Sequence, residues 1–276
     1  MFVVVGAQRT GTNLLREILN TNDEIAMLGE IFSPSEAPAH WDNFVRAHPA
    51  ERVSFASHAE LEALLDRYFD FVRYRIHNYW EGNRKSRSSA LGVDVKYNQL
   101  RSIQPGGRCG GAKPFLVDYL SSRGFTLVHT IRRNVIESAL SALIASQRGL
   151  WHNYEGALLD RSYHIDADEC LACARNTVGE RAAFCKWAEG SGIVTSYYDE
   201  LLRDVARAGP DGVIPEGPGS LLTIARALDV PFSFRYDGRL QKAINVPYSR
   251  VIANFDELLR SLASSEFWAY AAALHG

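Results

Sequence analysis

The sequence contains little of what usually marks a special environment. Four cysteines in 276 residues are too few for a scaffold held together by disulfides. No apolar run approaches the roughly 20 residues that a membrane-spanning helix needs. The formal net charge of -2 gives no general argument for binding nucleic acid or an anionic membrane. We therefore expect neither a membrane span nor a nucleic-acid partner, and a disulfide-rich fold is excluded.

Signals for metal binding and for export are also incomplete. Cys170 and Cys173 form a CxxC pair near Cys185 and His164, but no second CxxC or HxxxH half accompanies them. Zinc binding or redox activity is the weaker alternative for these cysteines and for Cys109. Buried or incidental thiols are the stronger one, and no metal is expected. The first residues lack a basic segment and a cleavage site, so we expect no signal peptide and a cytoplasmic protein.

The sequence does contain enough apolar material for a large core. Hydrophobic residues make up 46% and aromatic residues 11% of the chain, which suits one domain over residues 1–276. Strand and helix patterns alternate, which predicts a mostly parallel sheet with helices on both faces. The expected strands are residues 2–5, 24–32, 90–97, 125–131 and 192–198. Helices are expected at residues 13–19, 59–80, 115–122, 135–143, 177–188, 221–228 and 255–270, with residues 33–49 and 149–175 irregular.

The first of these strands leads into a loop that is suited to an anion. Residues 2–5 are four apolar residues in a row, three of them β-branched, and residues 6–11 have the composition of a tight turn. Helical spacing begins at Asn13 and continues through Leu14, Leu15, Ile18 and Leu19. A strand, a loop of small residues and a helix N-terminus together aim backbone N–H groups and a positive dipole at one point. This arrangement favours a phosphate group, and a merely structural glycine turn is the alternative.

The loop has the glycine spacing of a Walker A sequence but not its side chains. Gly6 and Gly11 are separated by four residues, yet Thr12 and Asn13 occupy the positions of the phosphate-binding Lys and the magnesium-binding Ser or Thr. The cation within the loop is Arg9. An ordinary Mg-ATP or Mg-GTP site is therefore disfavoured.

This loop resembles the first motif of the sulfotransferases that use 3′-phosphoadenosine-5′-phosphosulfate (PAPS). It is most similar to the bacterial carbohydrate sulfotransferases of the nodulation-factor and trehalose type. The resemblance implies an α/β fold, a P-loop NTPase-like three-layer sandwich with a mostly parallel sheet and helices on both faces. It also implies that Arg9 supplies positive charge to the leaving group. Arg9 is also implied to bind the donor, and the residues implied to hold its 5′-phosphate are Thr10, Gly11, Thr12 and Asn13.

A second phosphate signal follows the expected strand 125–131. Arg133 leaves the end of this strand, where open α/β sheets bind ligands, and Ser141 lies two turns into the next helix. An Arg fork and a hydroxyl suit a terminal phosphate, although an Arg at a strand end and a Ser packed on a helix are the simpler reading of these two alone. In the sulfotransferases an Arg followed eight residues later by a Ser binds the 3′-phosphate of PAPS. The resemblance therefore implies this role for Arg133 and Ser141.

The resemblance extends over most of the chain. Residues 197–204 and 221–232 are similar to a segment that is mainly structural in the family. Residues 245–258 resemble the C-terminal tail of the bacterial group. The Lys-Gly-x-x-Gly tail motif of the cytosolic enzymes is absent, so roles for Lys242 and Ser249 stay open.

Glu30 is the candidate for the catalytic base. Gly29-Glu30-x-Phe32 resembles the Glu followed by an aromatic residue that serves as base in the trehalose-type enzymes; a surface Glu at a strand end is the alternative. The irregular stretch also contains two alternative bases or acceptor contacts, His152 and His164. Lys96 faces either the sulfonate or solvent. His129, inside a strand, is expected to be packed.

These observations favour metal-independent, in-line transfer of a sulfuryl group from PAPS to a hydroxyl of a carbohydrate or glycosylated small molecule, with 3′,5′-adenosine bisphosphate as product. An ATP-dependent P-loop small-molecule kinase and a non-catalytic nucleotide-binding module are the alternatives. The acceptor and the oligomeric state, a homodimer included, stay open. Aromatic residues of the irregular segments either stack on a sugar or fill the core, namely Trp41, Trp151 and Tyr154.

Overall fold

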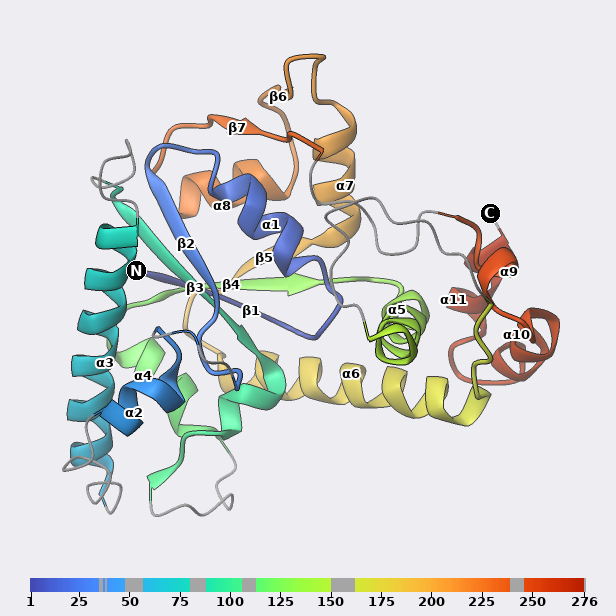
Figure 1. Ribbon diagram of the computed structural model, residues 1–276, viewed down its shortest axis with the longest axis horizontal. Helices are drawn as coiled ribbons and strands as arrows, with labels where there is room; N and C mark the ends of the chain where they lie inside the picture. The colour runs from blue at the N-terminus through green and yellow to red at the C-terminus, as the bar shows by residue number, and fades with distance from the viewer. Residues whose placement is uncertain are drawn as a thin grey trace.

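A computed structural model describes the chain at residues 1–34, 37, 39–47, 57–79, 88–105, 113–149, 162–238 and 246–275. Its centre is a five-stranded parallel sheet with the order β2-β3-β1-β4-β5 (Figure 1). The strands are β1 (Phe2–Gly6), β2 (Ile25–Glu30), β3 (Ala90–Lys96), β4 (Thr126–Ile131) and β5 (Val194–Tyr197). The α-helices up to the fifth strand are α1 (Thr12–Leu19), α2 (Trp41–Ala47), α3 (His58–Tyr79), α4 (Phe115–Ser122), α5 (Val135–Arg148) and α6 (Ala167–Trp187). The later ones are α7 (Tyr198–Ala206), α8 (Ser220–Ala227), α9 (Tyr248–Val251), α10 (Phe255–Ala263) and α11 (Trp268–Ala272).

Alternate side chains of the buried strands pack against helices on opposite faces of the sheet. In β1, Val3 and Val5 belong to a hydrophobic cluster with α3 and α4, whereas Phe2 and Val4 belong to one with α1 and α8. This is the period-two pattern of a strand that is buried on both sides. Figure 1 shows the resulting layers, with α1, α7 and α8 on one side and α3 and α4 on the other. The predicted α/β, P-loop NTPase-like three-layer fold is confirmed.

The register brings the carboxyl ends of three strands together at the loop after β1. Gly6, the last residue of β1, pairs with Lys96 at the end of β3 on one side and with Thr130 of β4 on the other. Ligands of open parallel sheets bind at such an edge. Lys96 and the residues that follow β4 therefore flank the loop from opposite sides.

The helices near the C-terminus form a third hydrophobic cluster, which α6 connects to the sheet. Cys170, Leu171 and Ala174 of α6 pack with α5, α10 and α11, while Phe184 belongs to the cluster under the sheet. Figure 1 shows α6 running from the region of α10 towards η3 (Tyr97–Arg101). One helix thus belongs to both parts of the core.

Three local predictions differ from the structure. Residues 33–49 are not all irregular, because α2 buries Phe44 and Val45 against α3. Residues 149–175 are not all irregular either: α6 begins at Ala167, where Asp166 accepts a hydrogen bond from the N–H of Glu169 at 2.8 Å and caps the helix. Expected helix 255–270 is divided into α10 and α11. A two-stranded antiparallel pair that was not predicted joins β6 (Val213–Ile214) to β7 (Phe234–Arg235).

Several predicted residues lie outside the described part of the chain: Cys109, Trp151, His152, Tyr154 and Lys242. Among the described residues, none of the helices is long and apolar enough to cross a membrane.

Candidate functional site

The loop between β1 and α1 has the backbone shape of an anion cradle. Arg9 and Gly11 both have left-handed backbone conformations, with φ of 65° and 87°. The hydroxyl of Thr10 closes the turn by donating to the carbonyl of Ala7 at 2.8 Å. Left-handed residues alternating with right-handed ones turn successive N–H groups to the same side. The loop and the N-terminus of α1 together therefore suit a phosphate group, as the sequence predicts.

Neighbouring atoms leave no room for a larger residue at either glycine of the loop. A Cβ at Gly11 would lie 2.3 Å from the ring of Tyr198, the first residue of α7. A Cβ at Gly6 would lie 2.8 Å from the carbonyl oxygen of Thr130. The glycine spacing in the sequence thus reflects both the turn and close packing by β4 and α7.

Lys96 brings a second cation to this loop from the neighbouring strand. Its ammonium group donates to the hydroxyl of Thr12 and, at 2.6 Å, to the carboxylate of Asp94. The Lys96 side chain is only 2% exposed. A lysine buried to this extent needs a counter-charge, and Asp94 supplies it from the same face of β3.

Glu30 belongs to the same network. One of its oxygens accepts a hydrogen bond from the Gln99 amide at 2.8 Å, and the other lies 3.8 Å from the Lys96 ammonium. The Gln99 carbonyl oxygen accepts from the backbone N–H of Lys96 at 2.9 Å, which turns its NH₂ towards Glu30. The Glu30 carboxylate is 24% exposed. It is therefore both positioned by Gln99 and accessible to a ligand.

Ser141 contacts the loop arginine. The Nε–H of Arg9 donates to the Ser141 hydroxyl at 3.0 Å, which joins the loop to α5. Burial lowers the pKa of the Arg9 guanidinium, and the positive charge of Arg132 lowers it further. The guanidinium stays charged at any working pH, so Arg9 places a partly buried positive charge in the loop.

The contacts of Arg133 are with α7 and not with Ser141. Its guanidinium forms ion pairs with Asp199 and, at 2.7 Å, with Glu200, both on α7. It stacks on the Tyr197 ring at 3.7 Å, and its side chain is 45% exposed. Among the contacts of the described residues, Ser141 is joined to Arg9 and Arg133 to the acids of α7, so the structure does not pair the two residues that the resemblance brings together.

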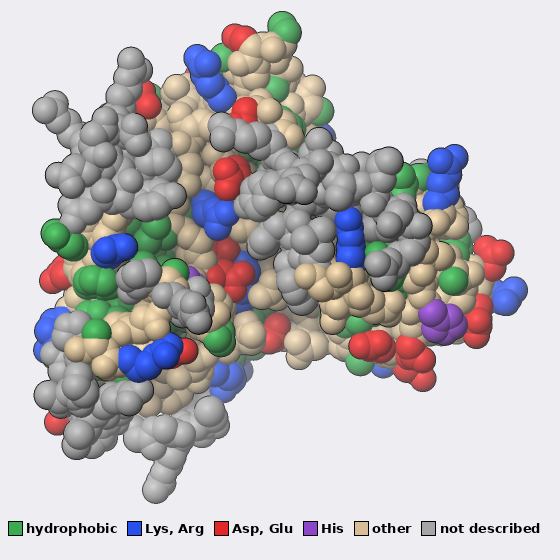
Figure 2. Space-filling model, in the orientation of Figure 1, with side chains coloured by type: hydrophobic (Ala, Val, Ile, Leu, Met, Phe, Trp, Pro, Cys, Tyr) green, Lys and Arg blue, Asp and Glu red, His purple; other side chains and the backbone are tan. Residues whose placement is uncertain are grey.

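The sequence indicates part of this network, through two charged residues in the third expected strand, residues 90–97. Asp94 and Lys96 are charged residues two positions apart in an otherwise apolar strand, so both side chains lie on one face. That placement, next to the end of β1, brings Lys96 to the loop. Gln99 and Tyr198 carried no such signal. Figure 2 shows acidic and basic side chains gathered together in the middle of this face of the molecule.

His129 and the cysteines are outside this network. His129 is buried in β4, bonded to the Tyr97 hydroxyl through Nε2, with the Cys185 thiol 3.9 Å from Nδ1. Burial lowers the pKa of His129 to about 4, and the charge of Arg181 contributes further. His129 is thus a packed neutral residue, as expected. The described cysteines are free thiols, and no cluster of metal ligands occurs among the described residues.

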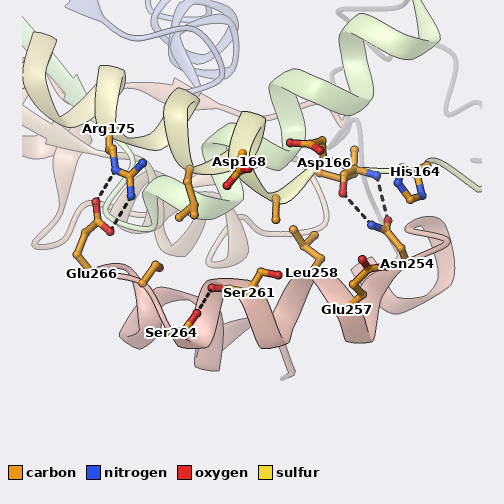
Figure 3. Close-up of a pocket in the computed structure, with 14 residues that line it drawn as sticks. His164, Asp166, Asp168, Arg175, Asn254, Glu257, Leu258, Ser261, Ser264 and Glu266 are labelled. Carbon is orange, nitrogen blue, oxygen red and sulfur yellow. Dashed lines mark hydrogen bonds and ion pairs between the residues drawn. The ribbon is translucent and has the colours of Figure 1, made fainter.

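A groove of about 490 Å³ lies between α6 and α10. Figure 3 shows Arg175 paired with Glu266 at one end and Asn254 bonded to the backbone at the other. Its charged lining is mainly acidic and includes Asp166, Asp168 and Glu257, with His164 beside them. Carboxylates repel a multiply phosphorylated ligand. None of the residues predicted for PAPS lines the groove, so His164 is separated from the Glu30 network.

Known proteins add little to this picture. No protein-family model matches the chain, and no curated protein matches it. Among solved structures it is similar to a sulfotransferase from Alicyclobacillus acidocaldarius, with 14% sequence identity and a TM-score of 0.43. The alignment covers 99% of this chain and 95% of that one. A similarity at this level does not indicate a function, so the function is inferred from the residues of the site.

Proposed function

We propose that the chain is one sulfotransferase domain that moves a sulfuryl group from PAPS to a hydroxyl of a carbohydrate or glycosylated small molecule. The observation that carries the proposal is the position of Lys96. Its ammonium group contacts Thr12 in the phosphate loop and lies 3.8 Å from the Glu30 carboxylate. One buried cation thus connects a cradle for a phosphate with a carboxylate able to take a proton.

Lys96 also accounts for the missing Walker lysine. The position after Gly11 holds Thr12, whose hydroxyl is instead the contact point for a lysine from β3. A cation at this point suits the bridging oxygen of a departing bisphosphate, because charge develops there in the transition state. Thr12 and Asn13 lack the side-chain pair that would bind a nucleotide with magnesium. Both features favour a metal-independent donor over Mg-ATP.

The residues divide into two roles in the proposed reaction. The residues that would hold the donor are Arg9, Thr10, Gly11, Thr12, Asn13, Arg133 and Ser141, of which Arg133 would have to exchange its carboxylate partners for phosphate. Glu30 would accept the proton of the acceptor hydroxyl while the hydroxyl oxygen bonds to sulfur and the bond from sulfur to the bridging phosphate oxygen breaks. Arg9 and Lys96 would stabilise the charge left on that oxygen.

A transfer assay tests this proposal. The protein is incubated with PAPS and a panel of mono- and disaccharides in EDTA, and release of 3′,5′-adenosine bisphosphate is followed. We expect release that depends on an acceptor sugar, persists without divalent metal and is lost in Glu30→Gln. Magnesium-dependent phosphorylation of the same sugars by ATP, with PAPS inert, would contradict it.

A further inference from the structure

Arg132, the residue directly after β4, occupies a position that the sequence does not single out. Its side chain is 12% exposed, whereas that of Arg133 is 45% exposed. Its guanidinium lies 4.9 Å from the centre of the Tyr198 ring, the same ring that packs against Gly11. Arg132 therefore faces the phosphate loop, and Arg133 faces outwards.

The bonding of Arg132 is incomplete within the described residues. One terminal nitrogen donates to Glu137 in the first turn of α5, but the buried Nε–H has no hydrogen-bond partner there. An unpaired donor on a buried charged group is costly, because it has lost water without replacement. Such a group is satisfied when an acceptor with several oxygens enters the site, and phosphate matches the guanidinium fork.

Arg132 and Lys96 come to the phosphate loop from opposite sides. In the sheet, β1 lies between β3 and β4. Lys96 approaches the loop from β3, and Arg132 follows the strand on the other side. Lys96 contacts Thr12 at the start of α1, where the proposed 5′-phosphate would lie. Arg132 lies on the side of α5, next to Arg9 and its partner Ser141.

We propose that Arg132 binds the 3′-phosphate of the donor, through its Nε–H and the guanidinium N–H groups that Glu137 and Tyr248 do not use. This inference rests on the proposed function, because it assigns a second anionic group of the same donor. The ring of Tyr198 holds the guanidinium in place by stacking. The phenol of Tyr248 is a further hydrogen-bond neighbour of Arg132, and it donates to the backbone carbonyl of Glu137 at 3.4 Å. The two adjacent arginines thus differ in their present contacts: Arg132 has a buried Nε–H without a partner among the described residues, whereas Arg133 is paired with two carboxylates of α7.

The test compares two ligands that differ only in the 3′-phosphate. Adenosine 3′,5′-bisphosphate and adenosine 5′-monophosphate are titrated into wild type, Arg132→Met and Arg203→Met by calorimetry. Arg203 is the matched control, because it lies on α7, carries the same charge and is 71% exposed. We expect Arg132→Met to weaken the bisphosphate about tenfold to a hundredfold, the range for one charge-assisted contact, and the monophosphate less than about threefold. Arg203→Met should leave both affinities within about threefold of wild type.

The outcomes are distinguishable. Equal loss of both ligands in Arg132→Met, or an unchanged preference for the bisphosphate, would overturn the assignment. If the wild-type protein does not bind the bisphosphate, that result contradicts the proposed function itself, not only the role of Arg132. Should Arg132→Met fold poorly by circular dichroism, Arg132→Lys replaces it. That variant keeps the charge but loses the fork, so we expect a selective loss of bisphosphate affinity, and an unchanged preference would again overturn the assignment.

Discussion

The ammonium group of Lys96, the last residue of β3, donates a hydrogen bond to the hydroxyl of Thr12, the first residue of α1. The two residues are 84 positions apart in the chain. Their contact places a buried positive charge at the mouth of the loop that follows β1. It is the relationship on which the proposed chemistry depends, and its consequences can be measured.

Substitutions of Asp94 and Lys96 should have non-additive effects on the free energy of unfolding, because the two side chains form a buried ion pair. Lys96→Met leaves the Asp94 carboxylate buried without its partner, which destabilises proteins by about 3–5 kcal/mol. The double variant Asp94→Asn with Lys96→Met removes both charges, so we expect it to recover most of that loss. Urea denaturation of the two single variants and the double variant gives the coupling free energy. Additive losses in the double variant would show that the pair does not act as a unit.

The same double variant separates stability from binding. With the buried charge removed in a folded protein, we expect affinity for adenosine 3′,5′-bisphosphate to fall about tenfold or more, because one charge-assisted contact is gone. Calorimetry measures the change. Affinity equal to wild type would mean that Lys96 is a structural lysine with no contact to the donor.

Glu30→Gln should abolish transfer and leave donor binding intact. Loss of a general base lowers turnover by about a hundredfold to ten-thousandfold, whereas the Gln99 amide can still bond to the Gln carbonyl oxygen. Sulfuryl transfer and bisphosphate affinity are measured on the same preparation. Glu17→Gln, an exposed carboxylate on α1, is the control and should keep wild-type turnover. A variant that retains transfer would exclude Glu30 as the base.

Gly11→Ala should remove nucleotide binding. An alanine at this position would have to adopt φ of 87°, which is strained for any residue with a side chain. Its Cβ would also lie 2.3 Å from the Tyr198 ring, so the loop or α7 has to move. Gly124→Ala is the matched control, because Gly124 also has a positive φ, 67°, but open space around its Cβ position. The control should lose about 1–2 kcal/mol of stability from backbone strain alone and keep its affinity for the bisphosphate. Equal effects of the two substitutions on binding would show that the contact between Gly11 and Tyr198 is unimportant.

His129 should make stability depend on pH in a defined window. Its pKa is about 4 in the folded protein and about 6.5 when unfolded, so between these values the unfolded chain binds more protons. The free energy of unfolding therefore rises as pH increases from 4 to 6.5, and this contribution is lost as pH falls through 4. His129→Gln should reduce the slope in this window by up to about 1.4 kcal/mol per pH unit. The check is urea denaturation at several pH values, and an unchanged slope would contradict the assignment of a neutral buried imidazole.

Local patterns predicted the elements well where each residue's surroundings follow from its neighbours in sequence. The strand, loop and helix at residues 2–19 have the predicted order. The apolar positions that indicate a helix at 59–80 are all buried in α3, namely residues 61, 64, 65, 68, 69, 72 and 76. The start of α6 was missed although Asp166 with Asp168 and Glu169 is a standard N-terminal signal. The aromatic and irregular composition before it outweighed that signal.

The site was harder to predict because its contacts join distant elements. Spacing identified the loop and Ser141, but it could not show that Ser141 contacts Arg9, a residue 132 positions earlier. The spacing to Ser141 selected Arg133, but it could not show that Arg132 is the more buried of the two, because periodicity ends with the strand and the direction of the next side chain depends on α7. The carboxylates of Asp199 and Glu200 hold Arg133 outwards, and the Tyr198 ring holds Arg132 inwards.

The central claim is a metal-independent donor site on the loop between β1 and α1. Its most direct test is calorimetric titration with adenosine 3′,5′-bisphosphate and, separately, with ATP, each in EDTA and in magnesium. The account predicts tight binding of the bisphosphate in both buffers. Binding of ATP only with magnesium, and none of the bisphosphate, would contradict it.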